Sequence, residues 1–335
     1  MLKTIMFKKF FFIIIIVVLV LIGYYFISVN SKGNYVKQDF YIEKGDGVKL
    51  ISSKLKERGI IKSEQVFIIY SLVSGNAKKF VPGNHVIQNN LNISEISAVL
   101  ADSKSIVQER TITILEGWSV NEIAKYLDVQ EIVKKEEFIS ASEISLWNEK
   151  YVFLQDNKII NLEGFLFPDT YRIFVGTTAD KIIEKMLDNF KSKVTSQMVK
   201  DIGANNRSLQ EIITMASIIE KEAKYFSDKK MVSDVFWKRL TIGMPLQSDA
   251  TINYFTGKGL TRSRYVDLEI DSPYNTYKYK GLPPGPICNP GIESITSAIY
   301  PQSNEYLYFI TDSSGKAVFG KTFEEHKSNI AKYLD

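Results

Sequence analysis

The chain has 335 residues, of which 45% are hydrophobic and 24% are charged, so its composition is that of a globular protein and excludes a disordered or fibrous one. Its length predicts roughly two domains besides any membrane or leader segment. The chain has one cysteine, Cys288, and two histidines, His85 and His326. These counts exclude an intramolecular disulfide and a cysteine-based zinc site, and they argue against a histidine-rich metal site. We expect no metal and no cofactor.

The net charge of +4 arises mainly at the N-terminus. Lys3, Lys8 and Lys9 precede the first long apolar run, and no acidic residue occurs before Asp39. Without these three lysines, the 42 basic residues fall to 39 against 38 acidic ones. Because binding to nucleic acid needs a concentrated basic patch, this balance argues against nucleic acid as a partner.

Residues 10–29 form an apolar run of 20 positions, about the length that a helix needs to cross a bilayer. A cleaved signal peptide would have a shorter apolar region and a small-x-small site, and no Ala-x-Ala follows this run. The sequence therefore predicts an uncleaved single-pass membrane anchor. The lysines within residues 1–9 predict a cytoplasmic N-terminus, which places the body of the protein outside the cytoplasmic membrane.

Two segments of the N-terminal half resemble each other. Residues 44–55 and 116–127 each follow an alternating apolar stretch and join a glycine turn to an amphipathic pattern. This pattern predicts a strand, a turn and a helix of about three turns. Carbohydrate-binding LysM modules have the same order, although strand–turn–helix units are also common elsewhere. Residues 63–74 and 93–100 predict two further helices.

We expect an α+β fold in which a LysM-like region, residues 31–130, precedes a second domain, residues 131–335. Within the second domain, helices are predicted around residues 180–194 and 209–226. Near the C-terminus, aromatic and β-branched segments flank a turn cluster at residues 312–315 and predict a hairpin. After the hairpin, Thr322 and Glu325 form the pattern of a capping box, which predicts a final helix.

The helix predicted from residue 209 carries two glutamates at the edges of its apolar sector, Glu220 and Glu222. Partial burial raises the pKa of such a carboxyl and keeps it protonated, as a general acid for glycosidic cleavage requires. Two residues apart on a helix, they do not face each other and cannot form a retaining glycosidase pair by themselves. Edge charges are also ordinary on amphipathic helices, so the pattern alone leaves a solvated role open.

Rigid loops follow this helix. Asp249 comes soon after a Gly-Met-Pro break, residues 273–277 offer aromatic rings and amides, and residues 281–291 contain four prolines and three glycines. Aromatic faces and amide donors suit sugar rings, and a stiff loop holds neighbouring groups in place. Each loop taken alone is also compatible with a simple connector.

Taken together and in order, these motifs resemble the endolytic murein transglycosylase family, MltG (YceG-like). The resemblance covers the anchor, the LysM-like region and the whole C-terminal half. The matching motifs are residues 162–171, 216–223, 239–249, 272–277, 281–287, 289–291 and 306–309.

The resemblance implies a single-pass enzyme of the inner (cytoplasmic) membrane whose body faces the cell wall. Such enzymes cleave the β-1,4 bond between MurNAc and GlcNAc in nascent glycan strands, leave a 1,6-anhydro-MurNAc end and consume no water. The family's catalytic glutamate corresponds to Glu220, which would protonate the leaving oxygen and then assist attack by the sugar's own 6-hydroxyl. The implied partners are peptidoglycan strands, the membrane and peptidoglycan synthases. The candidate substrate-binding residues are Glu163, Asp169, Tyr171, Glu222, Gln247, Asp249, Tyr274, Asn275 and Tyr277.

Two other classes of function remain compatible with the sequence. A peptidoglycan hydrolase would use Glu220 together with a second carboxylate, such as Asp249, Glu163 or Asp169, to activate water. A non-catalytic scaffold that binds the cell wall would need only the anchor and the LysM-like repeat.

Overall fold

The computed structural model describes residues 2–33, 36–88, 90–106, 108–259 and 263–334. The chain forms two compact units, Met1–Glu109 and Arg110–Asp335, and both mix helices with short strands, in agreement with the expected α+β class. The division lies before the boundary expected at residue 130, because the second strand–turn–helix repeat folds with the C-terminal unit. This repeat therefore belongs to the unit that contains Glu220.

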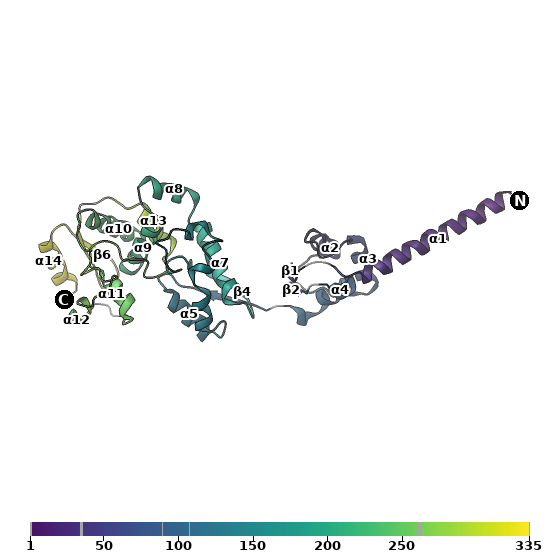
Figure 1. Ribbon diagram of the computed structural model, residues 1–335, viewed down its shortest axis with the longest axis horizontal. Coiled ribbons are helices and arrows are strands. Elements are labelled where there is room, and N and C mark those ends of the chain that lie inside the picture. Colours follow the sequence, from purple (N-terminus) through teal and green to yellow (C-terminus); the bar gives the residue numbers. More distant parts are fainter. Residues whose placement is uncertain (1, 34–35, 89, 107, 260–262, 335) are drawn as a thin grey trace. The chain divides into compact units, whose positions relative to one another are not determined.

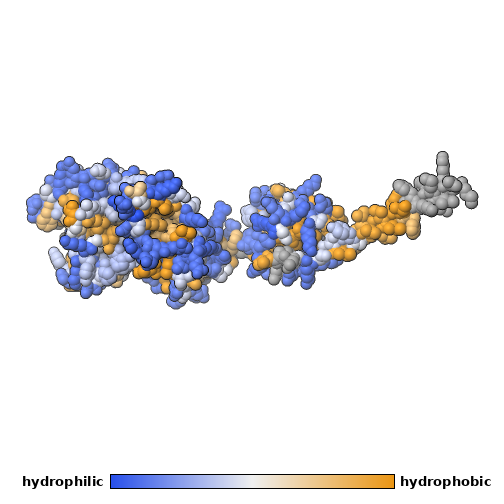
Figure 2. All heavy atoms as spheres, turned by 45° about the horizontal axis from the view of Figure 1, so that its top comes forward, coloured by the Kyte–Doolittle hydropathy of each residue, from blue (hydrophilic) through white to orange (hydrophobic). Residues whose placement is uncertain are grey.

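Helix α1 (Leu2–Asn30) has the properties of a membrane anchor. Its segment Phe12–Asn30 has a mean hydropathy of 3.0, and within the described residues it is the helix long and apolar enough to cross a membrane. Its apolar side chains form a continuous hydrophobic surface from residue 12 onward (Figure 2). The end of α1 contacts α3 and α4, and Val29 is buried among their apolar side chains. The helix thus runs from the apolar segment directly into the N-terminal unit.

The N-terminal unit has the order strand, two helices, strand, helix. Its two strands pair in antiparallel register, with Phe40 opposite His85. Ser63 and Asn92 accept hydrogen bonds as N-caps of the two helices predicted here, and Asn92 forms a full capping box with Glu95. The elements that follow α1 are β1 (Gln38–Ile42), α2 (Val48–Glu57), α3 (Glu64–Val73), η1 (Asn76–Lys78), β2 (Gly83–Ile87), α4 (Ile93–Ala101) and η2 (Ser103–Ser105).

The C-terminal unit opens with the second predicted repeat, in which β3 precedes a glycine turn and α5, and β3 pairs with β4. Both repeats therefore have the predicted strand–turn–helix structure. The elements of this unit, beginning one residue before its boundary, are β3 (Glu109–Thr113), α5 (Val120–Val129), α6 (Lys135–Ala141), η3 (Ile144–Leu146), η4 (Val152–Leu154), β4 (Thr170–Phe174), α7 (Ala179–Lys193), α8 (Ser196–Ala204), α9 (Leu209–Glu222), α10 (Phe226–Thr241), α11 (Asp249–Thr256), α12 (Tyr265–Leu268), α13 (Ile292–Ile299), β5 (Tyr308–Thr311), β6 (Ala317–Gly320) and α14 (Phe323–Tyr333).

Helix α9 is the central helix of this unit. A capping box of Ser208 and Glu211 begins it, and α10 and α13 contact it (Figure 1). The helix ends at Glu222, where Ala223 becomes extended (φ −133°, ψ 135°), and α10 begins at Phe226. The continuous helix expected to residue 226 is therefore wrong, because Ala223 and Phe226 prolong the apolar period beyond the last helical turn. This break places Glu220 in the last turn of α9.

The C-terminal hairpin and final helix agree with the sequence prediction. Strands β5 and β6 pair antiparallel, and the Asp312 side chain accepts hydrogen bonds within the turn. The Thr322 hydroxyl accepts from Glu325 N at 3.2 Å, whereas the Glu325 carboxylate accepts from Lys321 N at 2.6 Å. The second hydrogen bond of the capping box therefore comes from Lys321 N, one residue before the N-cap Thr322, rather than from Thr322 N.

Candidate active site

The Glu220 carboxylate lies at the meeting point of three helices. Its Oε1 accepts from Lys229 Nζ at 3.0 Å, and its Oε2 accepts from Gly291 N at 3.0 Å and Ser294 Oγ at 2.6 Å. The side chains of Glu220 and Lys229 are only 9% and 4% exposed. Glu220 is therefore part of an ion pair almost removed from water, and its two oxygens receive three hydrogen bonds.

The partners of Glu220 come from elements that offset its unfavourable place on α9. A carboxylate in the last turn of a helix meets the negative end of the helix dipole. Gly291 is the N-cap of α13 and Ser294 lies in its first turn, so Glu220 also meets the positive end of α13. Lys229 projects from α10 and supplies a full positive charge. These three groups hold a negative charge in one orientation.

Removing Lys229 should therefore destabilise the protein strongly. We expect Lys229→Met to lower the free energy of unfolding by about 3–5 kcal/mol, because it leaves the buried Glu220 carboxylate without its cation. The double variant Lys229→Met/Glu220→Gln should recover part of this loss. Denaturant titrations of both variants measure the effect, with the exposed Lys224→Met as the matched control. A loss in Lys229→Met no larger than in the control would contradict this view of the pair.

A second carboxyl, Glu116, adjoins the same position; from the sequence it is expected only as part of a glycine turn. Its carboxylate lies so close to Gly291 that a β-carbon added there would be 1.9 Å from Glu116 Oε1. Its neighbour Gly117 lies against Glu220, since a β-carbon at Gly117 would be 3.6 Å from Glu220 Cγ. The pKa of Glu116 is raised by burial and then by the charge of Glu220, while Lys229 lowers it. Two carboxyls thus share this site.

On the other edge of α9, Glu222 belongs to a separate polar cluster. The Ser248 hydroxyl donates to its carboxylate, and Asp249 accepts from the Tyr277 hydroxyl at 3.0 Å. Burial raises the pKa of Glu222, the Ser248 hydrogen bond and the Arg239 charge lower it, and the charge of Asp249 raises it. The structure therefore brings three of the predicted binding residues together: Glu222, Asp249 and Tyr277.

Glu163 is buried, at 5% exposure, and holds two segments together. Its oxygens accept from Val120 N at 3.0 and 3.2 Å, from Asn289 Nδ2 at 3.3 Å and from the Tyr254 hydroxyl at 3.4 Å. The ring of Tyr254 lies 5.0 Å from that of Tyr274, centroid to centroid. Burial raises the pKa of Glu163 to about 8. The carboxyl thus ties the first turn of α5 to the loop that leads to Gly291.

Asp169 and Tyr171 form another cluster, at the start of β4. Asn189 Nδ2 donates to Asp169 Oδ2 at 3.0 Å and to the Tyr171 hydroxyl at 3.1 Å, while that hydroxyl donates to Phe167 O at 2.5 Å. In the part of the chain that the structure describes, Asp169, Glu163 and Asp249 form no hydrogen bond or ion pair with Glu220. The carboxyl adjoining Glu220 is Glu116, which is not among the candidate residues predicted from the sequence.

Asn275 and Gln247 occupy two different settings. Asn275 is fully buried, its amide nitrogen donates to two backbone carbonyls at 2.8 Å, and its oxygen accepts from two backbone amides at 3.1 and 3.3 Å. Its amide is used within the loop, which favours a bracing role for Asn275 over the predicted sugar contact. Gln247 is exposed, with a φ of 53°, and its N–H donates to Thr276 O at 3.1 Å.

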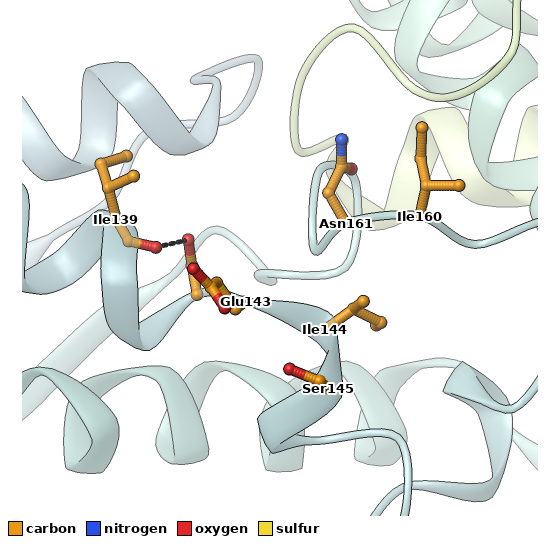
Figure 3. Close-up of a pocket in the computed structure, with 7 residues that line it drawn as sticks. Ile139, Glu143, Ile144, Ser145, Ile160 and Asn161 are labelled. Atoms are coloured by element: carbon orange, nitrogen blue, oxygen red, sulfur yellow. Dashed lines mark hydrogen bonds between the residues drawn. The ribbon is translucent and has the colours of Figure 1, made fainter.

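A cavity of about 340 Å³ lies elsewhere in the C-terminal unit (Figure 3). Ile160 and Asn161 face the segment around Glu143 across it. No candidate catalytic or binding residue lines this cavity. Its lining residues are Ile139, Ser142, Glu143, Ile144, Ser145, Ile160 and Asn161.

Comparison with known proteins identifies the family. The YceG-like family matches residues 40–332. The chain belongs to the YceG-like family. It is 36% identical over 304 residues to the endolytic murein transglycosylase of Bacillus subtilis (strain 168), covering 88% of this chain and 84% of the relative.

Two further comparisons agree with this assignment. The chain is 31% identical over 335 residues to the endolytic murein transglycosylase of Streptococcus pneumoniae serotype 2 (strain D39), covering 92% of this chain but only 60% of that relative. A crystal structure of a YceG-like protein from Listeria monocytogenes, at 32% identity, covers 87% of this chain and 98% of that chain with a TM-score of 0.61. The resemblance inferred from the motifs is confirmed.

The YceG-like match begins inside β1 and ends inside α14. It includes the second repeat with Glu116, the α9 terminus with Glu220 and the loop that carries Gly291. All the groups around the Glu220 carboxylate are therefore part of the matched region.

Proposed function

We propose that this protein is a membrane-anchored endolytic lytic transglycosylase that cleaves the MurNAc–GlcNAc β-1,4 bond of nascent peptidoglycan strands and leaves 1,6-anhydro-MurNAc ends. Its curated relatives are named endolytic murein transglycosylases. The observation that carries the proposal is the setting of Glu220. This motif glutamate is held by Lys229, Gly291 N–H and Ser294 at the junction of three helices.

The reaction places two demands on such a site. The bond from C1 to the leaving oxygen breaks while a bond from C1 to the sugar's 6-oxygen forms, so one proton must be delivered and one removed. Positive charge also develops at the sugar ring, and a fixed carboxylate stabilises it. Because three donors already orient Glu220, it needs little reorganisation when that charge develops. The cluster of Glu222, Asp249 and Tyr277, at the same end of α9, would hold sugar hydroxyls.

The N-terminal unit fits a supporting role in this proposal. Its β1–α2–α3–β2 order, with an antiparallel strand pair, supports a LysM-like module that binds the glycan. The lysines before the apolar segment support a cytoplasmic N-terminus in the inner membrane, with both units on the cell-wall side. Peptidoglycan synthases, which extend nascent strands at that surface, are the proposed protein partners.

The anchor leads to a prediction about solubility. A chain shortened to begin near Ser31 should stay in the soluble fraction, whereas the full chain should sediment with membranes, because the shortened chain lacks the apolar surface of α1. Fractionation of cells that express either form, followed by N-terminal sequencing of the full-length product, checks this. An N-terminus trimmed near Asn30 in the full-length product would show a cleaved leader instead.

Digestion of purified glycan strands by the full-length protein in detergent tests the proposed activity. Mass analysis should find ends lighter by one water than hydrolysed ends, because the 6-hydroxyl rather than water attacks C1. Ordinary reducing ends would identify a hydrolase, and binding without cleavage would identify a scaffold. Either result would contradict the proposed reaction.

A further inference from the structure

We propose that Glu116 is a second catalytic carboxyl and that it, rather than Glu220, donates the proton to the leaving oxygen. This inference rests on the proposed function and divides the two proton transfers of that reaction between two residues. Glu116 would act as the acid, and the fixed Glu220 carboxylate would act as the base and as the stabilising charge.

Gly291 lies between the two carboxyls. Its N–H donates to Glu220 Oε2 at 3.0 Å. The Glu116 carboxylate fills the space that a side chain at position 291 would occupy. A β-carbon added to Gly291 would lie 1.9 Å from Glu116 Oε1. The residue after Glu116 also lies against Glu220, at Cγ. Two contacts, at Gly291 and at Gly117, therefore place Glu116 beside Glu220.

The two carboxyls have different surroundings. Both oxygens of Glu220 accept hydrogen bonds, one of them from a buried ammonium, so its contacts are those of an ionised carboxylate. The Glu116 residue is exposed to solvent, although its carboxylate is partly buried against Gly291. Burial and the charges of Glu220 and Glu293 raise the pKa of Glu116, and Lys229 opposes them. A carboxyl with a raised pKa next to a fixed carboxylate is the arrangement that separates an acid from a base.

The proton steps balance without water or another reactant. As the bond from C1 to the leaving oxygen breaks, the Glu116 proton moves to that oxygen. The 6-oxygen bonds to C1, and its proton moves to the Glu220 carboxylate. The proton then passes from Glu220 to the adjacent Glu116, which restores both groups for the next cycle.

Substrates with different leaving groups test this division in the full-length protein. On glycan strands, Glu116→Gln should be slower than wild type by about 10²–10⁴-fold, the usual contribution of general acid catalysis. On a GlcNAc–MurNAc oligosaccharide bearing a 2,4-dinitrophenyl leaving group, it should stay within about tenfold of wild type, since this leaving group needs no proton. Glu220→Gln should be slow on both substrates.

Gly291→Ala gives a matched variant that keeps both carboxyls. The backbone at Gly291 (φ −75°, ψ 169°) is open to alanine, so its N–H to Glu220 can persist. The new β-carbon would displace the flexible end of Glu116. We expect the same pattern as in Glu116→Gln, with loss on strands and retention on the aryl glycoside. Glu293→Gln is the control: it should keep the wild-type rate below the falling limb of the pH profile and shift that limb to lower pH.

Three outcomes would overturn the proposal. Strand cleavage by folded Glu116→Gln within about threefold of wild type would remove Glu116 from the mechanism. Equal losses on both substrates would make it a positioning residue, and rescue of Glu220→Gln by the aryl glycoside would reverse the roles. The ends produced by the wild-type protein separately report the proposed function. Independently of activity, a ¹³C carboxyl titration should show the pKa of Glu116 falling in Glu220→Gln, and an unchanged pKa would refute the coupling.

Discussion

Glu220→Gln should abolish the formation of anhydro ends, with a loss of about 10³-fold or more, because both general base catalysis and a fixed negative charge are removed. Glutamine keeps the shape of the side chain and preserves an acceptor for one of its partners. It cannot take a proton from the 6-hydroxyl or stabilise positive charge at C1. Cleavage of defined glycan strands, with mass analysis of the ends, measures the loss.

The fold must be checked in the same experiment, because Glu220→Gln leaves Lys229 as a buried cation without its carboxylate. Circular dichroism of the variant separates lost chemistry from lost structure. Glu222→Gln is the matched control, since Glu222 lies on the same helix but in the cluster of Ser248 and Asp249. Glu222→Gln should lose less cleavage activity than Glu220→Gln. A folded Glu220→Gln within a few-fold of wild type would move the search for the essential carboxyl to Glu116, Glu163, Asp169 and Asp249.

Local patterns in the sequence predicted much of the fold. The two strand–turn–helix repeats, the capped helices α3 and α4 and the C-terminal hairpin depend on signals a few residues apart, namely apolar periods, caps and turn residues. The same kind of signal placed Glu220 at the edge of an apolar sector. It failed at the end of α9, because the apolar period continues through Ala223 into the next helix.

The contacts of the site could not be predicted in the same way. Lys229 reaches Glu220 from the next helix, nine residues on, and Glu116 reaches it from a segment distant in sequence. Neither has a local pattern that distinguishes it from a solvated charge. The position of Glu220 at the edge of an apolar sector therefore did not predict its buried ion pair with Lys229. Asn275 shows a related limit, because the amide that suits a sugar hydroxyl is equally suited to backbone carbonyls within its own loop.

Glu163 should make stability depend on pH. Burial raises its pKa in the folded protein from 4.5 to about 8, so the folded state binds its proton more tightly than the unfolded state does. A group with a raised pKa contributes stability that is fully present below about pH 4.5 and is lost as the pH rises to about 8. The loss amounts to about 4 kcal/mol over this range, since each pKa unit corresponds to about 1.4 kcal/mol. Other groups titrate as well, so the comparison must isolate this one.

Glu163→Gln provides that comparison. Glutamine remains neutral and can still accept from Val120 N, so the variant should lack this part of the pH dependence. The unfolding free energy of wild type minus that of Glu163→Gln should therefore fall by about 4 kcal/mol between pH 4.5 and pH 8. Urea unfolding at several pH values measures it, with the exposed Glu149→Gln as a control that should run parallel to wild type. Parallel curves for wild type and Glu163→Gln would mean that Glu163 ionises in the folded protein as it does in water. In that case water would have to reach the contact between α5 and the Asn289 loop, and the loop that carries Gly291 would be held less firmly than its hydrogen bonds indicate.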